Sequence, residues 1–365
     1  MTDATLALAE VAASSRGGDR RALARVTMVA LAFLLAIAAL ASLTIGASGA
    51  SGLSVVGSWF GLVDASDPAV MRDKLIIYDI RLPRLVLGML VGAGLAVSGA
   101  VMQGLFRNPL ADPGLVGVSA GASLGAVGVI VLGASVLAPL TAVLGIFALP
   151  IAAFAGGLGT TLVLYRVATR HGQTAVATML LAGIAIGAFG GAITGVLIYI
   201  ANDAQLRDLT FWNLGSLAGA NWTKVASAAL PIAGGIAMSM TLAGGLNAIT
   251  LGEATAHHLG IPLQRLKVLA IVSVAAAVGA SVAVSGGIGF VGIVVPHVLR
   301  LLIGPDNRYL LPGSALLGAS FLLVADTVSR VIVAPAELPI GIITAAVGGP
   351  FFLWILLRRQ SQLWN

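Results

Sequence analysis

The chain has 365 residues, of which 58% are apolar and only 9% are charged, whereas soluble domains usually carry about 25% charged residues. This composition excludes an ordinary water-soluble fold, and the long unbroken apolar runs favour membrane-spanning helices over the short alternating strands of a β-barrel. The net charge of +6 comes without a basic cluster interleaved with aromatic residues, which argues against a nucleic-acid partner, and the lack of cysteine excludes disulfides and thiolate sites.

The chain begins with a polar, basic segment before its first apolar run. We expect residues 1–22 to form a flexible cytoplasmic tail that carries Arg16, Arg20 and Arg21. The apolar stretch 26–45 is 20 residues long, which exceeds the roughly 7–15 apolar residues of a cleavable signal peptide. A retained first membrane helix is therefore favoured over a signal peptide, and residues 23–365 are expected to form a single transmembrane domain.

Charge-free stretches predict the next five spans. Residues 85–106, 172–202 and 225–252 are each long enough for one helix that crosses the membrane. Residues 113–165 make 53 positions without a charge, more than twice the roughly 20 that one crossing requires. This stretch is therefore expected to cross twice and to turn near residues 137–139.

The stretch 268–299 is harder to assign, because its 32 residues suit one crossing but both of its flanks are basic. Arg265 and Arg300, at its two ends, both predict a cytoplasmic position, which requires an even number of crossings. The Ser-Gly-Gly run at residues 285–287 supplies a break. Two crossings leave the second helix short, and interrupted helices in membrane proteins tend to line a transport pathway.

The last two spans are predicted at residues 309–325, continuing past Asp326, and at residues 338–357, which Arg358 and Arg359 terminate. The chain is thus expected to be all-α and polytopic, with about ten membrane helices and both termini in the cytoplasm. Thirteen basic residues then fall inside, namely Arg16, Arg20, Arg21, Arg25, Arg107, Arg166, Arg170, Arg265, Lys267, Arg300, Arg308, Arg358 and Arg359. Seven fall outside, namely Arg72, Lys74, Arg81, Arg84, Arg207, Lys224 and Arg330. The inward excess agrees with the known topological bias, while the outside arginines need a reason.

Several motifs typical of soluble enzymes occur without the structural context that they need. Residues 287–292 fit the dinucleotide pattern GxGxxG, and residues 117–121 and 121–125 fit the nucleophile pattern GxSxG. Both patterns require a strand followed by a helix, so close packing of small residues between membrane helices explains them better. No lysine follows a GxxxxGK[ST] loop. If transport is driven by ATP, the ATPase is therefore another polypeptide.

The histidines are weak candidates for metal ligands. His257 and His258 are adjacent, so on a helix they face different directions, and no HExxH motif surrounds them. We expect them at a solvated interface. His297 lies in the short eighth helix, where a structural hydrogen bond is a simpler role than haem ligation. No metal, cofactor or catalytic group is therefore expected on this chain.

Three segments carry a specific resemblance to a known family. They are residues 81–114, residues 289–313 and residues 325–341, which include the runs RLPR, RNPLADPG, GFVGIVVPHVLR, ADTVSR and ELPIG. Together they resemble the FecCD-type permeases, the membrane subunits of type II ABC importers for iron siderophores, haem and cobalamin. The resemblance extends from about residue 26 to the end of the chain.

The resemblance implies a homodimer with the path along its axis, lined by the fifth and tenth helices. It also implies two ATPase subunits, which would hold ATP and magnesium, and a periplasmic binding protein. The loop at about 250–262 resembles the coupling helices that contact the ATPase, with an ordinary solvated connector as the alternative. The coupling residues would be Glu253, Ala256, His257, His258, Leu259 and Gly260.

The resemblance also gives a role to the outside arginines. Arg81, Arg84 and Arg330 occupy positions at which the family pairs arginines with acidic residues of the binding protein, which would fix the docking register. For Arg330 the competing prediction is an ion pair with Asp326, four residues before it on the same helix. The family's cytoplasmic gate corresponds by position to four residues: His171, Gly172, Gln173 and Thr174.

The substrate is the least determined feature. Residues 203–219 look most like the haem-permease branch, so haem is the first candidate, ahead of a ferric siderophore and cobalamin. An ion-coupled secondary transporter would need several intramembrane ionisable residues, and an intramembrane enzyme would need paired carboxylates or a serine with a base. The only acid well inside a span is Asp326. Both alternatives are therefore weaker than an importer permease of the bacterial inner membrane.

Overall fold

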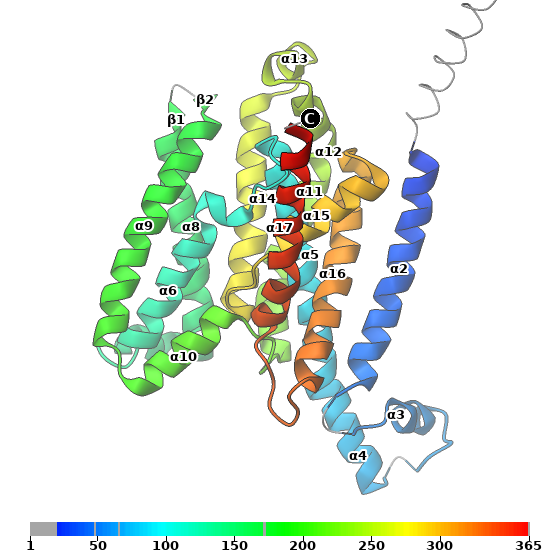
Figure 1. The fold of residues 1–365 in the computed structure, drawn as a ribbon. Helices are drawn as coiled ribbons and strands as arrows, with labels where there is room; N and C mark the ends of the chain where they lie inside the picture. The colour runs from blue at the N-terminus through cyan, green and yellow to red at the C-terminus, as the bar shows by residue number, and fades with distance from the viewer. Residues whose placement is uncertain (1–19, 47–48, 65, 171–172, 364–365) are drawn as a thin grey trace, which may run out of the picture.

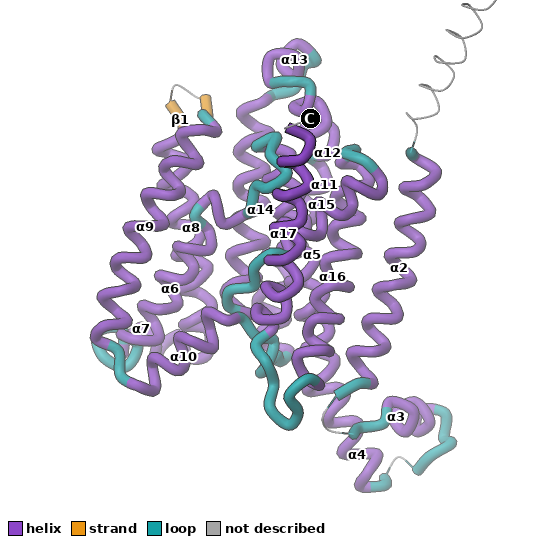
Figure 2. The backbone as a smooth tube through the Cα atoms, in the orientation of Figure 1, coloured by secondary structure: helices purple, strands orange, loops and turns teal. Residues whose placement is uncertain are grey.

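The computed structural model describes residues 20–46, 49–64, 66–170 and 173–363, and this part of the chain is helical almost throughout (Figure 2). In chain order the elements are α2 (Arg21–Thr44), α3 (Gly52–Trp59), α4 (Pro68–Leu75), the π-helix η1 (Ile76–Arg81), α5 (Leu82–Leu105), the 3₁₀-helix η2 (Pro113–Val116), α6 (Val118–Leu132), α7 (Ala138–Leu144), the 3₁₀-helix η3 (Gly145–Phe147), α8 (Ala148–Ala168), β1 (Thr169–Arg170), β2 (Gln173–Thr174), α9 (Val176–Ile200), α10 (Asp203–Leu214), α11 (Trp222–Thr241), α12 (Ala243–Thr250), α13 (Glu253–His258), α14 (Leu263–Ser285), α15 (Val291–Ile303), α16 (Asn307–Val331) and α17 (Ile340–Leu363). Most of the predicted tail at 1–22 lies outside the described residues.

Each predicted span corresponds to an apolar helical element. Among the described residues, six helical stretches are long and apolar enough to cross a membrane, the bent pair α11–α12 makes a seventh, and α6, α15 and α17 are shorter apolar helices. The all-α fold with about ten spans is therefore confirmed. The chain turns between α6 and α7 and breaks after Ser285, as predicted. With its 13 residues, α15 rises only about 20 Å, less than the roughly 30 Å of a bilayer core.

The two ends of the bundle carry different structures (Figure 1). Helix α13 and the β1–β2 hairpin lie at one end, which we call the α13 end, and α3, α4 and α10 lie at the other, which we call the α4 end. Helix α2 begins at the α13 end, where α17 also finishes. Both described ends of the chain thus lie on the same side, as an even number of crossings requires.

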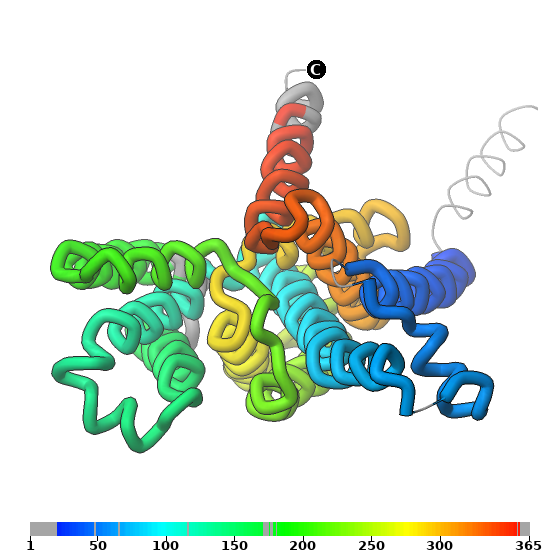
Figure 3. Tube along the Cα trace, turned by 90° about the horizontal axis from the view of Figure 1, so that it is seen from below, coloured from blue at the N-terminus to red at the C-terminus, as the bar shows by residue number. Residues whose placement is uncertain are grey.

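Helix α5 forms the centre of the bundle, with α11, α14, α15 and α16 packed around it (Figure 3). Its glycines allow this, because a side chain at Gly92 would overlap the carbonyl group of Gly318 in α16, and one at Gly99 would overlap that of Gly292 in α15. Gly292 ends the GxGxxG pattern, and Gly121 of the GxSxG patterns meets α8 in the same way at Gly156. Gly292 and Gly121 thus lie at close contacts between helices, as expected for small residues in a membrane protein.

The helical structure around the second span is longer than the sequence predicted. Helices α3 and α4 precede it, and the chain then continues through η1 into α5 without leaving helical geometry. In η1 the turn is wider, and the N–H of Leu82 donates to the carbonyl of Ile77, five residues before it. Pro83 follows directly and has no N–H to donate. Arg81 is the last residue of this wide turn.

Two further spans differ in detail from their predictions. The sixth span is bent by 51° between α11 and α12, where the N–H of Leu242 bonds to Ser239, three residues before it. Gly245 in α12 then lets the Leu266 side chain approach closely. The tenth helix does not stop at Arg358 and Arg359 but runs to Leu363. Arginine is a good helix former, so the two arginines end the apolar run without ending the helix.

Candidate functional site

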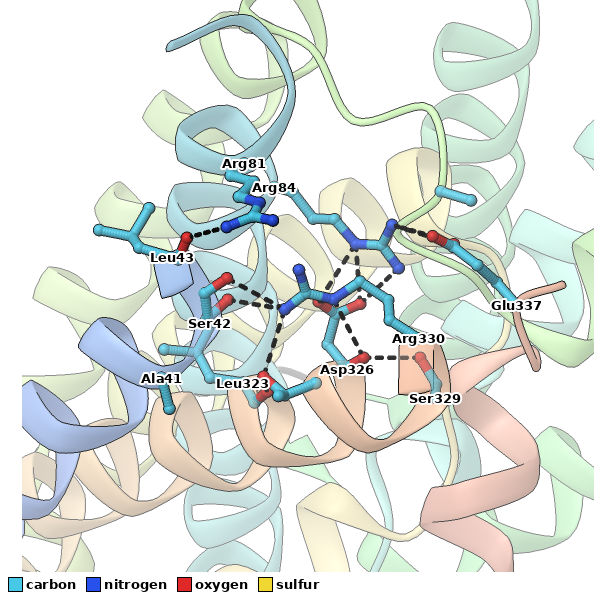
Figure 4. A network of polar contacts seen from close by, with 12 residues as sticks. Ala41, Ser42, Leu43, Arg81, Arg84, Leu323, Asp326, Ser329, Arg330 and Glu337 are labelled. Carbon is cyan, nitrogen blue, oxygen red and sulfur yellow. Dashed lines mark hydrogen bonds and ion pairs between the residues drawn. The ribbon is translucent and has the colours of Figure 1, made fainter. Parts of the chain in front are cut away.

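The three predicted docking arginines lie together at the α4 end (Figure 4). Arg81 ends η1, Arg84 lies in the first turn of α5 and Arg330 lies in the last turn of α16. All three residues are buried, with exposed fractions of 4%, 7% and 5% respectively. Buried cations are stable only when they are paired and hydrogen-bonded. Their partners therefore define the site.

Arg84 contacts two carboxylates at once. Its Nε and Nη2 donate to Asp326 of α16 at 3.0 Å and 2.8 Å, and its Nη1 donates to both oxygens of Glu337 at 3.0 Å. The Asp326 side chain is 1% exposed, whereas that of Glu337, in the loop between α16 and α17, is 37% exposed. One guanidinium thus joins a fully buried acid to a surface acid.

Arg330 completes the pairing of Asp326. Its Nε lies 3.1 Å from the second carboxylate oxygen of Asp326, so the predicted ion pair at i,i+4 spacing is confirmed. Its Nη2 donates to the carbonyl and hydroxyl oxygens of Ser42 in α2 at 3.2 Å and 3.1 Å. Asp326 is therefore held between two arginines, and the cluster ties α2, α5 and α16 together.

Arg81 binds the end of a helix. Its Nη1 donates to the carbonyl oxygens of Leu43, Thr44 and Ala50. Leu43 and Thr44 end α2, and the last carbonyls of a helix have no partner within it and carry partial negative charge. The guanidinium thus satisfies them. Gly46 leaves room beside the group, since a side chain there would lie 3.1 Å from Arg81 Nη2 and 3.6 Å from Arg330 Nη1.

The burial of these arginines changes what docking would require. The sequence places them on one surface of the protein, and the structure does gather them at one end, but each guanidinium already contacts an internal partner. A partner protein would have to replace one of those contacts, and docking by Arg81, Arg84 and Arg330 stays a prediction. Glu337 was not among the predicted site residues, although it is the only acidic residue after Asp326 in the sequence. Nothing in the sequence around Ser42 indicated that it would bind Arg330.

The predicted coupling segment forms a short helix, α13, at the opposite end of the bundle (Figure 1). Within this helix Ala256 is fully buried, while His257, His258 and the following Leu259 are exposed. Gly252 precedes the helix and Gly260 follows it, both with positive φ. Lys267 of α14 lies 2.9 Å from Glu253 and fastens α13 to the long helix behind it. The helical pattern expected here is present, and the coupling role stays a prediction.

The Glu253–Lys267 contact provides a test of how firmly α13 is attached. Lys267 is buried and the Glu253 side chain is 41% exposed, so the pair should contribute about 0.5–1 kcal/mol. Glu253→Gln is expected to leave the midpoint of thermal unfolding nearly unchanged while backbone amides of α13 exchange roughly threefold faster, as measured by hydrogen–deuterium exchange. Equal exchange in both proteins would show that the ion pair does not hold the helix.

Two of the predicted gate residues, Gln173 and Thr174, form one strand of a small hairpin. Strands β1 and β2 pair antiparallel, with Thr169 opposite Thr174 and Arg170 opposite Gln173. His171 and Gly172 lie outside the described residues. The hairpin is at the α13 end, between α8 and α9, so its position agrees with that of a loop before the fifth span. The gate role stays a prediction.

The break between α14 and α15 borders a cavity that could not be predicted from the sequence. It has a volume of about 180 Å³ and is lined in part by Asp112, Ser119, Gly287 and Phe290. Phe290 adopts a left-handed conformation with φ of +68°, and its side chain fills the space where Gly348 of α17 lacks one. The interrupted helix thus contacts α17 directly.

His297 is a packing residue in the described structure. Its ring meets Phe351 of α17 edge to face at a centroid distance of 6.0 Å. The predicted structural hydrogen bond of this histidine stays a prediction. The α15 segment therefore contacts α17 at two places, through Phe290 and through His297.

Comparisons with known proteins agree with these features. The model of the FecCD transport family matches residues 11–358. The hemin transport system permease protein HmuU of Yersinia pestis is 48% identical over 284 residues, which cover 78% of this chain and 84% of that protein. The vitamin B12 import system permease protein BtuC of Shigella boydii is 43% identical over 304 residues, which cover 83% of this chain and 89% of that protein.

A solved structure extends the agreement to three dimensions. It is an inward-facing conformation of a metal-chelate type ABC transporter, 32% identical, with a TM-score of 0.78 over 91% of this chain and 98% of the other.

Proteins of this kind are transport subunits rather than enzymes, and their ATPase is a separate polypeptide. They work as dimers with ATPase subunits and substrate-binding proteins, so partners of this general kind follow for the chain. Membership of this family therefore decides against the two alternative functions, an ion-coupled transporter and an intramembrane enzyme. The chain is a multi-pass membrane protein that belongs to the FecCD transport family, and it is the permease subunit of a type II ABC importer.

Proposed function

We propose that this chain passes haem from a periplasmic binding protein across the bacterial inner membrane to the cytoplasm. The observation that carries the proposal is the 48% identity with a hemin permease, against 42–45% with cobalamin and vitamin B12 permeases. The segment 203–219, which resembles the haem branch, supports it. That segment lies beside the end of α14 and the start of α17, since Ser216 N–H donates to Ser285 at 2.7 Å and Ile340 N–H donates to Gly215 at 3.0 Å.

The path would run along the axis of a homodimer, between two copies of α9 and α17. Helix α17 projects from one edge of the chain when the bundle is viewed along its axis (Figure 3). Its outer side chains Leu353 and Leu357 are exposed, and so are Leu181 and Phe189 of α9. Apolar surface of this kind at a projecting helix suits a second copy of the chain. The glycine- and alanine-rich α9 would offer a bulky ligand few specific contacts, so that the ligand can leave.

The two ends of the bundle would then meet different partners. The α13 end faces the cytoplasm and receives two ATPase subunits, which bind ATP and magnesium, while no cofactor is proposed on this chain. The α4 end faces the periplasm and receives the binding protein near Arg81, Arg84 and Arg330. The excess of basic residues predicted at the α13 end supports this orientation.

Titration of the binding protein of the same importer tests the substrate. Addition of haemin is expected to give a shifted Soret band with saturation at low micromolar concentration, and the complete importer in proteoliposomes should take up haemin only with ATP. Tight binding of a ferric siderophore without a Soret shift would replace haem by the second candidate. Binding of cobalamin alone would favour the third, which the likeness to vitamin B12 permeases also supports.

Substitution at the tip of α13 tests the coupling role. Leu259 is 61% exposed, so Leu259→Asp should fold normally but place a charge where an apolar contact with the ATPase is proposed. ATP-dependent uptake is expected to fall roughly tenfold or more, with an unchanged midpoint of thermal unfolding. Leu259→Ala, which removes the contact without adding charge, should give an intermediate loss. Normal uptake by both variants would remove α13 from the ATPase interface.

A further inference from the structure

The two carboxylates that Arg84 contacts differ in how easily they could leave. Asp326 is fully buried, contacts both Arg84 and Arg330, and lies within α16, four residues before Arg330. Glu337 contacts only Arg84 among the described ion pairs, and its side chain is 37% exposed. Removing Asp326 would leave the buried guanidinium groups of Arg84 and Arg330 without their shared carboxylate. Moving Glu337 would expose only one side of the Arg84 guanidinium.

The backbone around Glu337 allows its side chain to move alone. Residues 332–336, before it, are exposed. The residue after it is anchored, because Leu338 N–H donates to the carbonyl of Ser329 at 3.1 Å, and Ile340 N–H is held as described above. A rotation of the Glu337 side chain therefore breaks the contact with Arg84 without disturbing the start of α17.

We propose that Glu337 occupies the Arg84 guanidinium in place of a partner's carboxylate, and that an acidic residue of the binding protein displaces it on docking. This inference rests on the proposed docking at the α4 end. It explains why a docking arginine lies buried. The Nη1 group of Arg84, which would bind the partner, donates to Glu337 until the partner arrives.

Charge balance supports the exchange. Arg84, Arg330, Asp326 and Glu337 form two cations and two anions at N–O distances of 2.8–3.1 Å. When Glu337 leaves, the remaining three groups carry one uncompensated positive charge at the edge of a buried cluster, which is unfavourable. An incoming carboxylate restores the balance of these four charges in the same place, beside the further positive charge of Arg81, whereas a neutral or basic group does not. The site thus selects an acidic partner and remains closed without one.

Affinity of the purified permease for the binding protein of the same importer tests the proposal. Glu337→Gln removes the competing charge and should tighten binding about fivefold, the equivalent of a partly exposed ion pair. Glu337→Asp keeps the charge but shortens the side chain, so it should also tighten binding, by a smaller factor. Asp208→Asn is the matched control, because it removes a charge from an exposed acid of α10 at the same end and should leave the affinity within twofold.

The outcomes separate this inference from the proposed docking. If the unmodified chain does not bind the binding protein, docking at this end is wrong. If the unmodified chain binds but both Glu337 variants bind equally well or more weakly, docking stands and the displacement of Glu337 is wrong. Asp208→Asn could also tighten binding as much as Glu337→Gln does, while Glu337→Asp has no effect. The affinity would then depend only on the net charge of this end of the protein, and the proposed exchange at Arg84 would be wrong.

Discussion

Asp326→Ala is expected to lower the free energy of unfolding by about 3–5 kcal/mol, because it leaves two buried arginines without their shared anion. Arg84 and Arg330 both contact Asp326, within 2.8–3.1 Å, and all three side chains are at most 9% exposed. The effect should appear as a large drop in the midpoint of thermal unfolding in detergent and in the yield of folded protein.

Two comparisons make this prediction specific to buried charge. Glu337→Gln removes a carboxylate from the same guanidinium but at the surface, so its cost should be at most about 1 kcal/mol. The triple variant Arg84→Met, Asp326→Leu and Arg330→Met removes Asp326 together with the two arginines that contact it and should recover much of the stability, since apolar replacements of buried ion clusters are often neutral. An Asp326→Ala protein as stable as the unmodified chain would mean that water reaches the cluster.

Gly99→Ala is expected to destabilise the chain by about 2–3 kcal/mol, the upper part of the usual range for overpacking. A methyl group at Gly99 of α5 would overlap the backbone of Gly292 in α15. Backbone cannot move aside as a flexible side chain can, so the two helices must separate. The Gln103 Nε2 bond to the carbonyl of Gly292, at 3.1 Å, and the 2.7 Å contact between Arg300 and Gln103 would be strained together. Thermal unfolding and hydrogen exchange of α15 measure the effect.

Gly128→Ala serves as the control for helical glycines. A side chain at this position of α6 has open space around it, so the change should be neutral or should stabilise by up to about 1 kcal/mol through helix propensity. The prediction fails if the two alanine variants unfold at the same temperature, because packing would then not depend on the contact between α5 and α15.

Much of the fold could be predicted because each membrane span requires a long, uninterrupted run of apolar residues, which is visible directly in the sequence. Apolar length predicted the spans, the double crossing of 113–165 and the short α15, and the basic flanks of 268–299 predicted the break at Ser285. The same pattern could not show α3 and α4, which are too short to be recognised as spans, or the bend at Leu242, because apolar length does not distinguish a straight helix from a bent one.

The site was predicted less completely. A resemblance picked out Arg81, Arg84 and Arg330, and the spacing of Asp326 and Arg330 predicted their ion pair. Neither could indicate that Arg84 reaches Glu337, 253 positions away in the chain.

By itself, then, the sequence determined that the chain crosses a membrane about ten times and belongs with importer permeases, because lipid demands long apolar helices and motifs of this length are specific. Only the tertiary structure decided how the polar residues are used. It placed Ser42, Arg84, Arg330 and Glu337 around Asp326, since a charge taken out of water is stable only where distant segments supply its partners. The arginines that the sequence offered as free docking groups are, in the folded chain, already paired.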